Sequence, residues 1–324
     1  MPNLLQLQQV VKKFPVKAGL FSRTVDWVQA VRGVSLEIGP SETLGLVGES
    51  GCGKTTVARL IARLAQPDQG KIFFEGNDIG SLSEKRLKPF RREIQMIFQD
   101  PFSSLNPRMK IGEIIAEPLM IHKVVGRREK REKVGEILSQ VGLSPNFYDR
   151  YPHEFSGGQR QRIGIARAVA LKPRLVVADE PVSALDVLVS AQIVDLLQEL
   201  QQKFQMSYLF ISHDLKTIDR LSHRVAVMYL GKIVETGSKE SLRRPLHPYT
   251  QALRAAVPVA DPKRKRKRIV LAGEVPSPIN PPPACAFHPR CPYAEKICRE
   301  EEPGLKEWRQ GHWAACHLVD KIHL

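Results

Sequence analysis

Residues 48–55 read GESGCGKT, and this stretch decides the fold class. It matches the pattern G-x-x-x-x-G-K-[ST]. It follows ETLGLV (42–47), which predicts a buried strand, and it runs into TTVARLIARL (55–64), whose apolar spacing predicts a helix. In that context glycines let backbone N–H groups approach phosphate oxygens, and the helix N-terminus adds a favourable dipole. We therefore expect a phosphate-binding loop in an α/β protein.

The loop predicts a set of nucleotide contacts, and a chance glycine turn is disfavoured by its strand–loop–helix setting. Lys54 can reach the β- and γ-phosphates, and the Thr55 hydroxyl suits Mg²⁺. Cys52 occupies a variable position, so we expect no special reactivity there. The predicted nucleotide-binding residues are Gly48, Glu49, Ser50, Gly51, Cys52, Gly53, Lys54, Thr55 and Thr56.

A second apolar strand, RLVVAD (174–179), ends in Asp179 and is followed directly by Glu180. Such a strand would hold Asp179 near Mg²⁺, while the next residue, Glu180, could hold an attacking water as a general base. Many strands end in acids, but the phosphate loop earlier in the chain strengthens this interpretation. The two features together indicate a P-loop NTPase.

A second glycine segment, FSGGQRQR (155–162), opens the predicted helix that runs through IGIARAVAL. Ser156, Gly157 and Gly158 would offer a hydroxyl, unhindered amides and a helix dipole to an anion. A purely structural glycine turn is the alternative. One nucleotide needs only one such cradle, so the second one calls for an explanation.

The segment Ser156–Gln159 supplies that explanation, because the chain resembles the ATP-binding cassette family, whose signature is SGGQ. The resemblance implies an α/β P-loop NTPase core of ABC-ATPase type, with an antiparallel β subdomain and a helical insertion. It also implies two subunits facing head to tail, with the signature segment of each completing the ATP site of the other.

Further positions match the family in order along the chain. By that resemblance, Gln99 in MIFQD senses Mg²⁺ and the γ-phosphate, and His213 in FISHD contacts the γ-phosphate. Asp186 ends the SALD segment (183–186), which in the family crosses the dimer interface. The implied catalytic residues are thus Glu180, His213 and Gln99, and the implied Mg²⁺ ligands are Thr55, Gln99 and Asp179.

The family usually has an aromatic residue near the N-terminus that stacks on adenine. Phe14 is the preferred candidate from its place in VVKKFP. Phe21 and Trp27 stay open as alternatives, because residues 15–28 look inserted.

Strand patterns recur at 4–11, 31–38, 70–76, 94–98, 207–212 and 223–231, and amphipathic helices are expected between about 111 and 171. We predict a nucleotide-binding domain over 1–245, with a helical subdomain at about 100–172. A C-terminal extension over 246–324 would comprise one short helix, a proline-rich extended arm (275–284) and a cysteine cluster.

Several segments resemble the ATP-binding subunits of bacterial oligopeptide and dipeptide importers: QDPFSSLNPR (99–108), RPLHPYTQAL (244–253), VPSPINPP (275–282) and the cysteine-bearing end. This resemblance implies import of di- and oligopeptides, with nickel or another small solute as the alternative. The implied partners are a different ATPase subunit in a heterodimer, two membrane-spanning permease subunits and an extracytoplasmic solute-binding protein. A coupling helix of a permease would enter a groove near 99–105.

The cysteines of the extension follow C-x5-C-x6-C-x17-C, as Cys285, Cys291, Cys298 and Cys316. This is not the paired C-x2-C spacing of common zinc modules. Four thiolates suit Zn²⁺ or a [4Fe–4S] cluster, and unmetallated thiols are the third possibility. The resemblance to importer subunits implies an iron–sulfur cluster at these cysteines, for which we expect a structural role.

Lys and Arg number 49 against 34 Asp and Glu, a formal charge of +15 that permits nucleic-acid, nucleotide or anionic-membrane contacts. The basic run KRKRKR (263–268) is interpreted as a solvated linker. A soluble cassette ATPase acting on nucleic acid is disfavoured, because the chain has one phosphate loop, one signature and a short helical insertion. A catalytically dead subunit is disfavoured because the motif residues are all present.

No signal peptide or bilayer-spanning apolar run is apparent. We therefore expect a peripheral protein at the cytoplasmic face of the bacterial inner membrane, reached through its partners.

Overall fold

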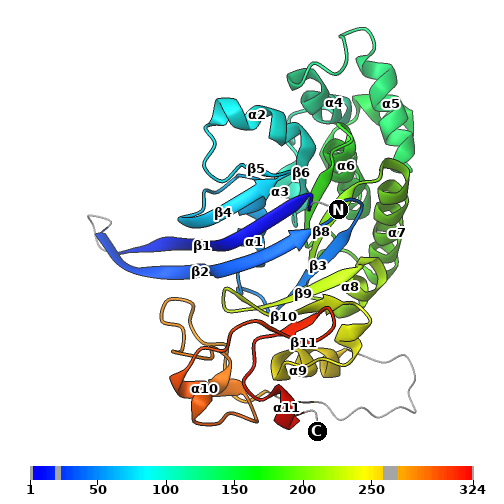
Figure 1. The fold of residues 1–324 in the computed structure, drawn as a ribbon. Helices are drawn as coiled ribbons and strands as arrows, with labels where there is room; N and C mark the ends of the chain where they lie inside the picture. Colours follow the sequence, from blue (N-terminus) through cyan, green and yellow to red (C-terminus); the bar gives the residue numbers. More distant parts are fainter. Residues whose placement is uncertain (1–2, 19–22, 258–268, 270, 323–324) are drawn as a thin grey trace, which may run out of the picture. The chain divides into compact units, whose positions relative to one another are not determined.

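The computed structural model describes residues 3–18, 23–257, 269 and 271–322 (Figure 1). The chain forms two compact units, which we describe separately. Unit 1 comprises 38–42 and 82–211, and unit 2 comprises the described parts of 2–37, 43–81 and 212–324. Phe21, an alternative candidate for the adenine contact, and the basic run 263–268, interpreted as a linker, lie outside the described residues.

Unit 1 contains three parallel strands, in the order β8-β7-β6, and the helices that accompany them. The strands are β6 (Ile94–Ile97), β7 (Leu175–Asp179) and β8 (Ser207–Ser212). The α-helices are α2 (Glu84–Glu93), α3 (Pro101–Ser104), α4 (Ile111–Ile121), α5 (Lys130–Gln140), α6 (Gly157–Val169) and α7 (Val187–Phe204). Two short 3₁₀ turns, η1 (Pro145–Asp149) and η2 (Pro152–Glu154), precede α6.

β7 and β8 are buried along their whole length, and β6 is buried except at half-buried Gln95. Continuous apolar strands are typical of parallel sheets covered on both faces. The region between β6 and β7 is helical, as expected, and α4 packs on α5, α6 and η1. Gly112 on α4 meets the Tyr148 ring so closely that an added Cβ would lie 2.5 Å from it.

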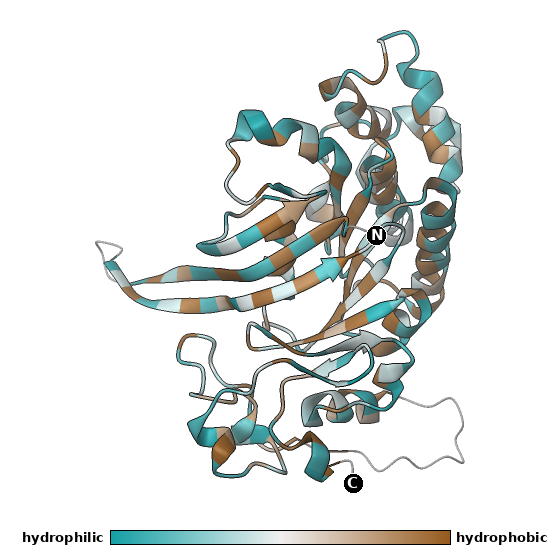
Figure 2. Ribbon diagram, viewed as in Figure 1, coloured by the Kyte–Doolittle hydropathy of each residue, from teal (hydrophilic) through white to brown (hydrophobic). Residues whose placement is uncertain are grey.

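Unit 2 contains a four-stranded antiparallel sheet in the order β2-β1-β4-β5. Its strands are β1 (Leu5–Ala18), β2 (Arg23–Ile38), β4 (Gln69–Phe74) and β5 (Asn77–Asp78). The segment that looked inserted in the sequence extends β1 and β2 into a long hairpin, along which hydrophobic and hydrophilic residues alternate (Figure 2).

A second group of strands in unit 2 runs in the order β11-β12-β10-β9-β3. They are β3 (Thr43–Val47), β9 (Arg224–Tyr229), β10 (Lys232–Ser238), β11 (Lys306–Arg309) and β12 (His312–Ala314). β3 and β9 are parallel, and the remaining pairs are antiparallel. The C-terminal strands therefore continue the sheet of β9 and β10, which their sequence did not predict.

The helices of unit 2 are mostly short. They are α1 (Lys54–Ile61), α8 (Leu215–Leu221), η3 (Ser241–Arg243), α9 (Pro248–Ala256), η4 (His288–Arg290), α10 (Ile297–Glu300) and α11 (Val319–Ile322). The described residues of 271–284 form no helix or strand, as expected for a proline-rich arm, and Pro278 O accepts a hydrogen bond from Gln29 N–H at 2.9 Å. None of the helices in the described part of the chain is long and apolar enough to cross a membrane.

Candidate functional site

The phosphate loop joins β3 to α1 in unit 2, and two of its glycines are sterically required. A Cβ on Gly48 would lie 2.2 Å from Met228 O, and a Cβ on Gly53 would lie 2.2 Å from Ala30 O. Gly53 also has φ +108, in the region that side-chain-bearing residues avoid. The loop is thus a tight turn pressed against its neighbours.

Lys54 opens α1 and is only 4% exposed. Its Nζ donates to Gly48 O at 2.8 Å and to Glu49 O at 3.0 Å, so the ammonium lies inside the loop. Thr55 and Thr56 follow on the first turn of the helix, while Ser50 and Gly51 are exposed at the tip. This arrangement suits a bound phosphate chain, which could compete with the loop carbonyls for the ammonium.

Cys52 is buried within the same loop, and its carbonyl accepts from Gly231 N–H at 2.9 Å. Burial raises the pKa of its thiol, and the Lys54 charge only partly offsets that effect. A raised pKa disfavours the thiolate. Burial and the raised pKa agree with the expectation of an unreactive cysteine, which stays a prediction.

The two acids at the end of β7, Asp179 and Glu180, lie in unit 1 and have different environments. Asp179 ends the strand and is 2% exposed, whereas Glu180 adopts φ +45. That left-handed backbone is unusual for a residue with a side chain and is often found at functional sites. Gln99, in the loop after β6, donates from Nε2 to Glu180 Oε2 at 3.3 Å. Two predicted catalytic residues thus meet within this unit.

The signature segment begins α6 with a capping box. Ser156 Oγ accepts from Gln159 N–H at 3.4 Å, and Gln159 Oε1 accepts from Ser156 N–H at 3.1 Å. A Cβ on Gly158 would lie 2.6 Å from Val189 Cγ1, so the segment packs directly on the first turn of α7. Ser156 is exposed, and Gly157 beside it is half-buried.

Asp186 caps α7, where its carboxylate accepts from Val189 N–H at 2.9 Å. The next two residues, Val187 and Leu188, are 89% and 70% exposed. Unit 1 therefore presents an exposed apolar helix start beside its signature segment.

The remaining predicted residues lie in unit 2. His213 is exposed after β8, and Asp214 caps α8 behind it by accepting from Lys216 N–H at 3.0 Å. Phe14 on β1 is 38% exposed and Trp27 on β2 is 48% exposed. No contact with the phosphate loop distinguishes the two aromatic side chains, so the adenine assignment stays a prediction.

The four C-terminal cysteines are free thiols in the described chain. Burial raises the pKa of Cys285 to about 11 and that of Cys316 to about 12, with smaller contributions from the neighbouring thiols. Cys285 N–H also donates to Cys298 O at 3.2 Å. The thiols are thus neighbours, but no group of three or more His, Cys, Asp or Glu side chains among the described residues is placed to hold a metal ion. As they stand, these thiols do not form a ready metal site.

Two features of unit 2 were missed by the sequence analysis. Tyr249 and Arg290 contact the phosphate loop at Glu49, and Glu235 forms a buried polar cluster with His312. Tyr249 lies in the segment RPLHPYTQAL (244–253), which resembles importer subunits but to which the sequence assigns no role. Arg290 carries no sequence signal that would distinguish it from the other basic residues.

Comparison with known proteins agrees with this geometry. The ABC transporter family matches residues 31–183, and the C-terminal region of oligopeptide/dipeptide transporters matches residues 234–298. The oligopeptide transport ATP-binding protein AppF of Bacillus subtilis (strain 168) is 56% identical over 98% of this chain and 97% of its own length. The dipeptide transport ATP-binding protein DppF of Escherichia coli (strain K12) is 47% identical over 98% of this chain and 95% of its own length.

The fold is also shared with a solved structure, the dimeric post-hydrolysis state of the ATP-binding cassette MJ0796 bound to ADP and Pi. It superposes with a TM-score of 0.65 at 27% identity, over 72% of this chain and 98% of that chain. Both the motifs and the whole-length similarity lead to one assignment: the chain belongs to the ABC transporter ATP-binding proteins of the oligopeptide and dipeptide transport family.

Proposed function

We propose that this chain is the ATP-hydrolysing subunit of an importer for di- and oligopeptides. The observation that carries the proposal is similarity to peptide transport ATP-binding proteins along nearly the whole chain, including the C-terminal region that matches oligopeptide/dipeptide transporters. An importer for nickel or another small solute is the second candidate, since the ATPase itself does not choose the solute.

In this proposal the phosphate loop binds ATP through its amides, with Lys54 on the β- and γ-phosphates. Thr55, Asp179 and Gln99 would hold Mg²⁺, which would neutralise charge on the phosphates. Glu180 orients and deprotonates the attacking water, and His213 contacts the γ-phosphate. The hydrogen bond from Gln99 to Glu180 supports a shared role for these two residues.

The test of the base is Glu180→Gln in the assembled transporter. ATP binding should be retained and hydrolysis should fall by at least 100-fold, because the amide cannot accept the proton of the water. Glu132→Gln on the exposed surface of α5 is a matched control and should hydrolyse ATP normally. Unchanged turnover in Glu180→Gln would mean that Glu180 is not the base, or that the ATP site of a partner subunit carries the hydrolysis.

We also propose that the signature segment and the start of α7 face a second ATPase subunit, a different chain in the native heterodimer. The exposure of Ser156, Val187 and Leu188 supports this, because apolar side chains at a helix start are normally covered. The test is whether the Glu180→Gln chain dimerises when ATP is added, as measured by size-exclusion chromatography. Ser156→Arg should abolish the dimer and leave ATP binding to the isolated chain intact.

The remaining partners are two permease subunits and an extracytoplasmic solute-binding protein, with the ATPase held at the cytoplasmic face of the membrane. Affinity purification from membranes should recover both permeases. Binding of peptides, but not of Ni²⁺, to the copurified solute-binding protein would separate the two candidate solutes.

For the cysteines, we propose a structural [4Fe–4S] cluster, with Zn²⁺ as the alternative. The hydrogen bond from Cys285 N–H to Cys298 O at 3.2 Å, and the neighbouring thiols that help to raise the pKa of Cys285, support a common site. Loading would require the thiols to deprotonate and draw closer. Absorbance near 400 nm after anaerobic purification supports the cluster, and a colourless protein with one equivalent of zinc refutes it.

A further inference from the structure

Glu49, the second residue of the phosphate loop, is held by two elements of the C-terminal region. Its N–H donates to Tyr249 Oη, on α9, at 2.8 Å. Its carboxylate accepts both terminal nitrogens of Arg290, on η4, at 2.7 and 3.1 Å. These partners lie 200 and 241 residues further along the chain. One loop residue is thus fixed at its main chain and its side chain.

Both contacts are built into a packed environment. Tyr249 is fully buried, with its ring centre 4.7 Å from that of Tyr229 and 5.5 Å from that of Phe287. The Arg290 side chain is 8% exposed, and its guanidinium lies 6.0 Å from the Tyr229 ring centre. A two-point pair between guanidinium and carboxylate in such a setting is strong and directional.

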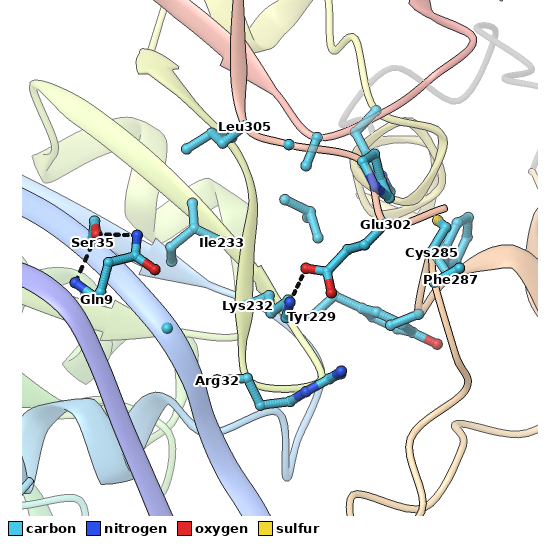
Figure 3. Close-up of a pocket in the computed structure, with 18 residues that line it drawn as sticks. Gln9, Arg32, Ser35, Tyr229, Lys232, Ile233, Cys285, Phe287, Glu302 and Leu305 are labelled. Carbon is cyan, nitrogen blue, oxygen red and sulfur yellow. Dashed lines mark hydrogen bonds and ion pairs between the residues drawn. The ribbon is translucent and has the colours of Figure 1, made fainter. Parts of the chain in front are cut away.

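Two of these aromatic residues, Tyr229 and Phe287, also line a cavity of about 260 Å³. Figure 3 shows Cys285 and Phe287 next to each other, with Tyr229 and the ion pair of Lys232 and Glu302 beside them. The cavity lining therefore connects the cysteine-bearing segment to the rings that surround Tyr249.

The contact at Glu49 N–H affects Lys54 through one peptide group. A trans peptide is planar, so the Glu49 N–H and the Gly48 C=O point in opposite directions. Tyr249 holds the N–H, and the C=O accepts from Lys54 Nζ at 2.8 Å. A tilt of this peptide would therefore move the carbonyl that positions the ammonium.

We propose that Tyr249 and Arg290 are positioning residues of the nucleotide site, which hold Glu49 so that the phosphate loop keeps the conformation that accepts ATP. The inference rests on the proposed ATPase function and adds the C-terminal region to the nucleotide-binding apparatus. Neither residue contacts the nucleotide in this scheme, because both act through Glu49.

The proposal also connects the cysteines to the loop. Arg290 lies between Cys285 and Cys291, in a segment of consecutive turns. In the first of these turns His288 N–H donates to Cys285 O at 3.0 Å. Cys291 N–H donates to His288 O at 3.3 Å in the next turn. A rearrangement of these cysteines would therefore reach Glu49 through Arg290.

The experiment measures the Kd of the full-length chain for a fluorescent ATP analogue with Mg²⁺. Tyr249→Phe keeps the ring packing and removes one acceptor, so Kd should rise about two- to tenfold. Arg290→Met should raise Kd by about tenfold or more. The Kd of Arg290→Lys should lie between those of wild type and Arg290→Met, because Lys keeps the charge but lacks the two-point geometry.

Two control variants remove similar groups elsewhere. Arg254→Met deletes another two-point pair, from α9 to Asp219 at 3.2 and 3.0 Å, which does not touch the phosphate loop. Tyr208→Phe deletes a buried hydroxyl that has no hydrogen-bond partner in the described part of the chain. Both should bind the analogue with wild-type Kd.

A double-mutant cycle distinguishes positioning from simple destabilisation. If Arg290 acts through Glu49, the effects of Glu49→Gln and Arg290→Met on Kd are non-additive. If Tyr249→Phe and Arg290→Lys fold normally by circular dichroism and bind within twofold of wild type, the positioning role is refuted. Lys54→Ala separates the positioning role from the assignment of the nucleotide site. If Lys54→Ala still binds the analogue, the phosphate loop is not the nucleotide site, whatever the effects of Tyr249 and Arg290.

Discussion

Glu235 offers the sharpest test of how the C-terminal strands are attached. Its side chain, on β10, is fully buried and accepts from Leu246 N–H at 2.7 Å and from His247 N–H at 3.0 Å. His312 Nε2, on β12, lies 2.7 Å from Glu235 Oε1 and is 1% exposed. One carboxylate therefore joins three segments of unit 2.

The change is Glu235→Leu, which keeps the volume and removes both oxygens. It leaves two buried N–H groups and an imidazole without their acceptor. Deleting one partner of a buried polar pair costs about 3–5 kcal/mol. With a urea dependence of about 2–3 kcal/mol per molar, the transition that involves β12 should move down by roughly 1–2.5 M.

Tryptophan fluorescence is a suitable assay, because Trp308 and Trp313 are two of the three tryptophans and both lie in the β11–β12 hairpin. Far-UV circular dichroism, recorded in parallel, reports the rest of the chain. Glu307→Gln is the control, since Glu307 only accepts from Gly311 N–H in an exposed turn and should change stability by less than about 0.5 kcal/mol. A fluorescence midpoint that is the same in Glu235→Leu and wild type would refute this account.

Three further variants test other parts of the structure. Burial lowers the pKa of His247 to about 4 from 6.5, so the unfolded chain binds a proton that the native chain excludes, and stability is lost as pH falls from about 6.5 to 4. His247→Asn should remove about 2 kcal/mol of the difference in urea stability between pH 7.5 and pH 5. Gly112→Ala should destabilise the α4 region by about 1–3 kcal/mol in thermal unfolding, since its Cβ would lie 2.5 Å from Tyr148, and an unchanged Tm would contradict this packing. Gly53→Ala should weaken ATP binding by at least tenfold, because φ is +108 and Ala30 O would be 2.2 Å from the Cβ; wild-type Kd would show that the loop can relax.

Local patterns predicted most of the fold. The buried strands at 174–179 and 207–212 and the helices after 111, 130 and 157 have strong apolar periodicity, and each appears in the structure within a few residues. The β1–β2 hairpin was only half predicted, because residues 12–18 and 23–30 carry many charged and polar residues. Strands in an exposed hairpin can be polar on both faces, which weakens the period-two signal.

The candidate site was predictable wherever a motif encodes a turn. GESGCGKT and SGGQ specify their own backbone geometry, so the loop around Lys54 and the helix start at Ser156 followed from sequence, whereas the capping box at Ser156 is a finding of the structure. The contacts of Glu49 with Arg290 and of Glu235 with His312 did not, because they join residues 241 and 77 positions apart. Each of these residues alone resembles a solvated charge, and only the folded chain reveals its partner.

The two C-terminal anchors are connected, and this leads to a last prediction. Glu235 holds the N–H groups of Leu246 and His247, and His247 Nδ1 in turn accepts from Tyr249 N–H at 3.1 Å at the start of α9. Because Tyr249 Oη contacts Glu49, loosening the start of α9 should reach the phosphate loop.

Glu235→Leu should therefore raise the Kd for ATP as well as lower stability, at a temperature where the chain is still folded. In a Tyr249→Phe background the same substitution should have a smaller effect on Kd, because the connecting hydroxyl is already absent. Glu307→Gln should change neither quantity. A Glu235→Leu chain that loses the C-terminal strands by fluorescence but binds ATP with wild-type affinity would show that the anchor at Glu235 and the clamp at Glu49 are independent.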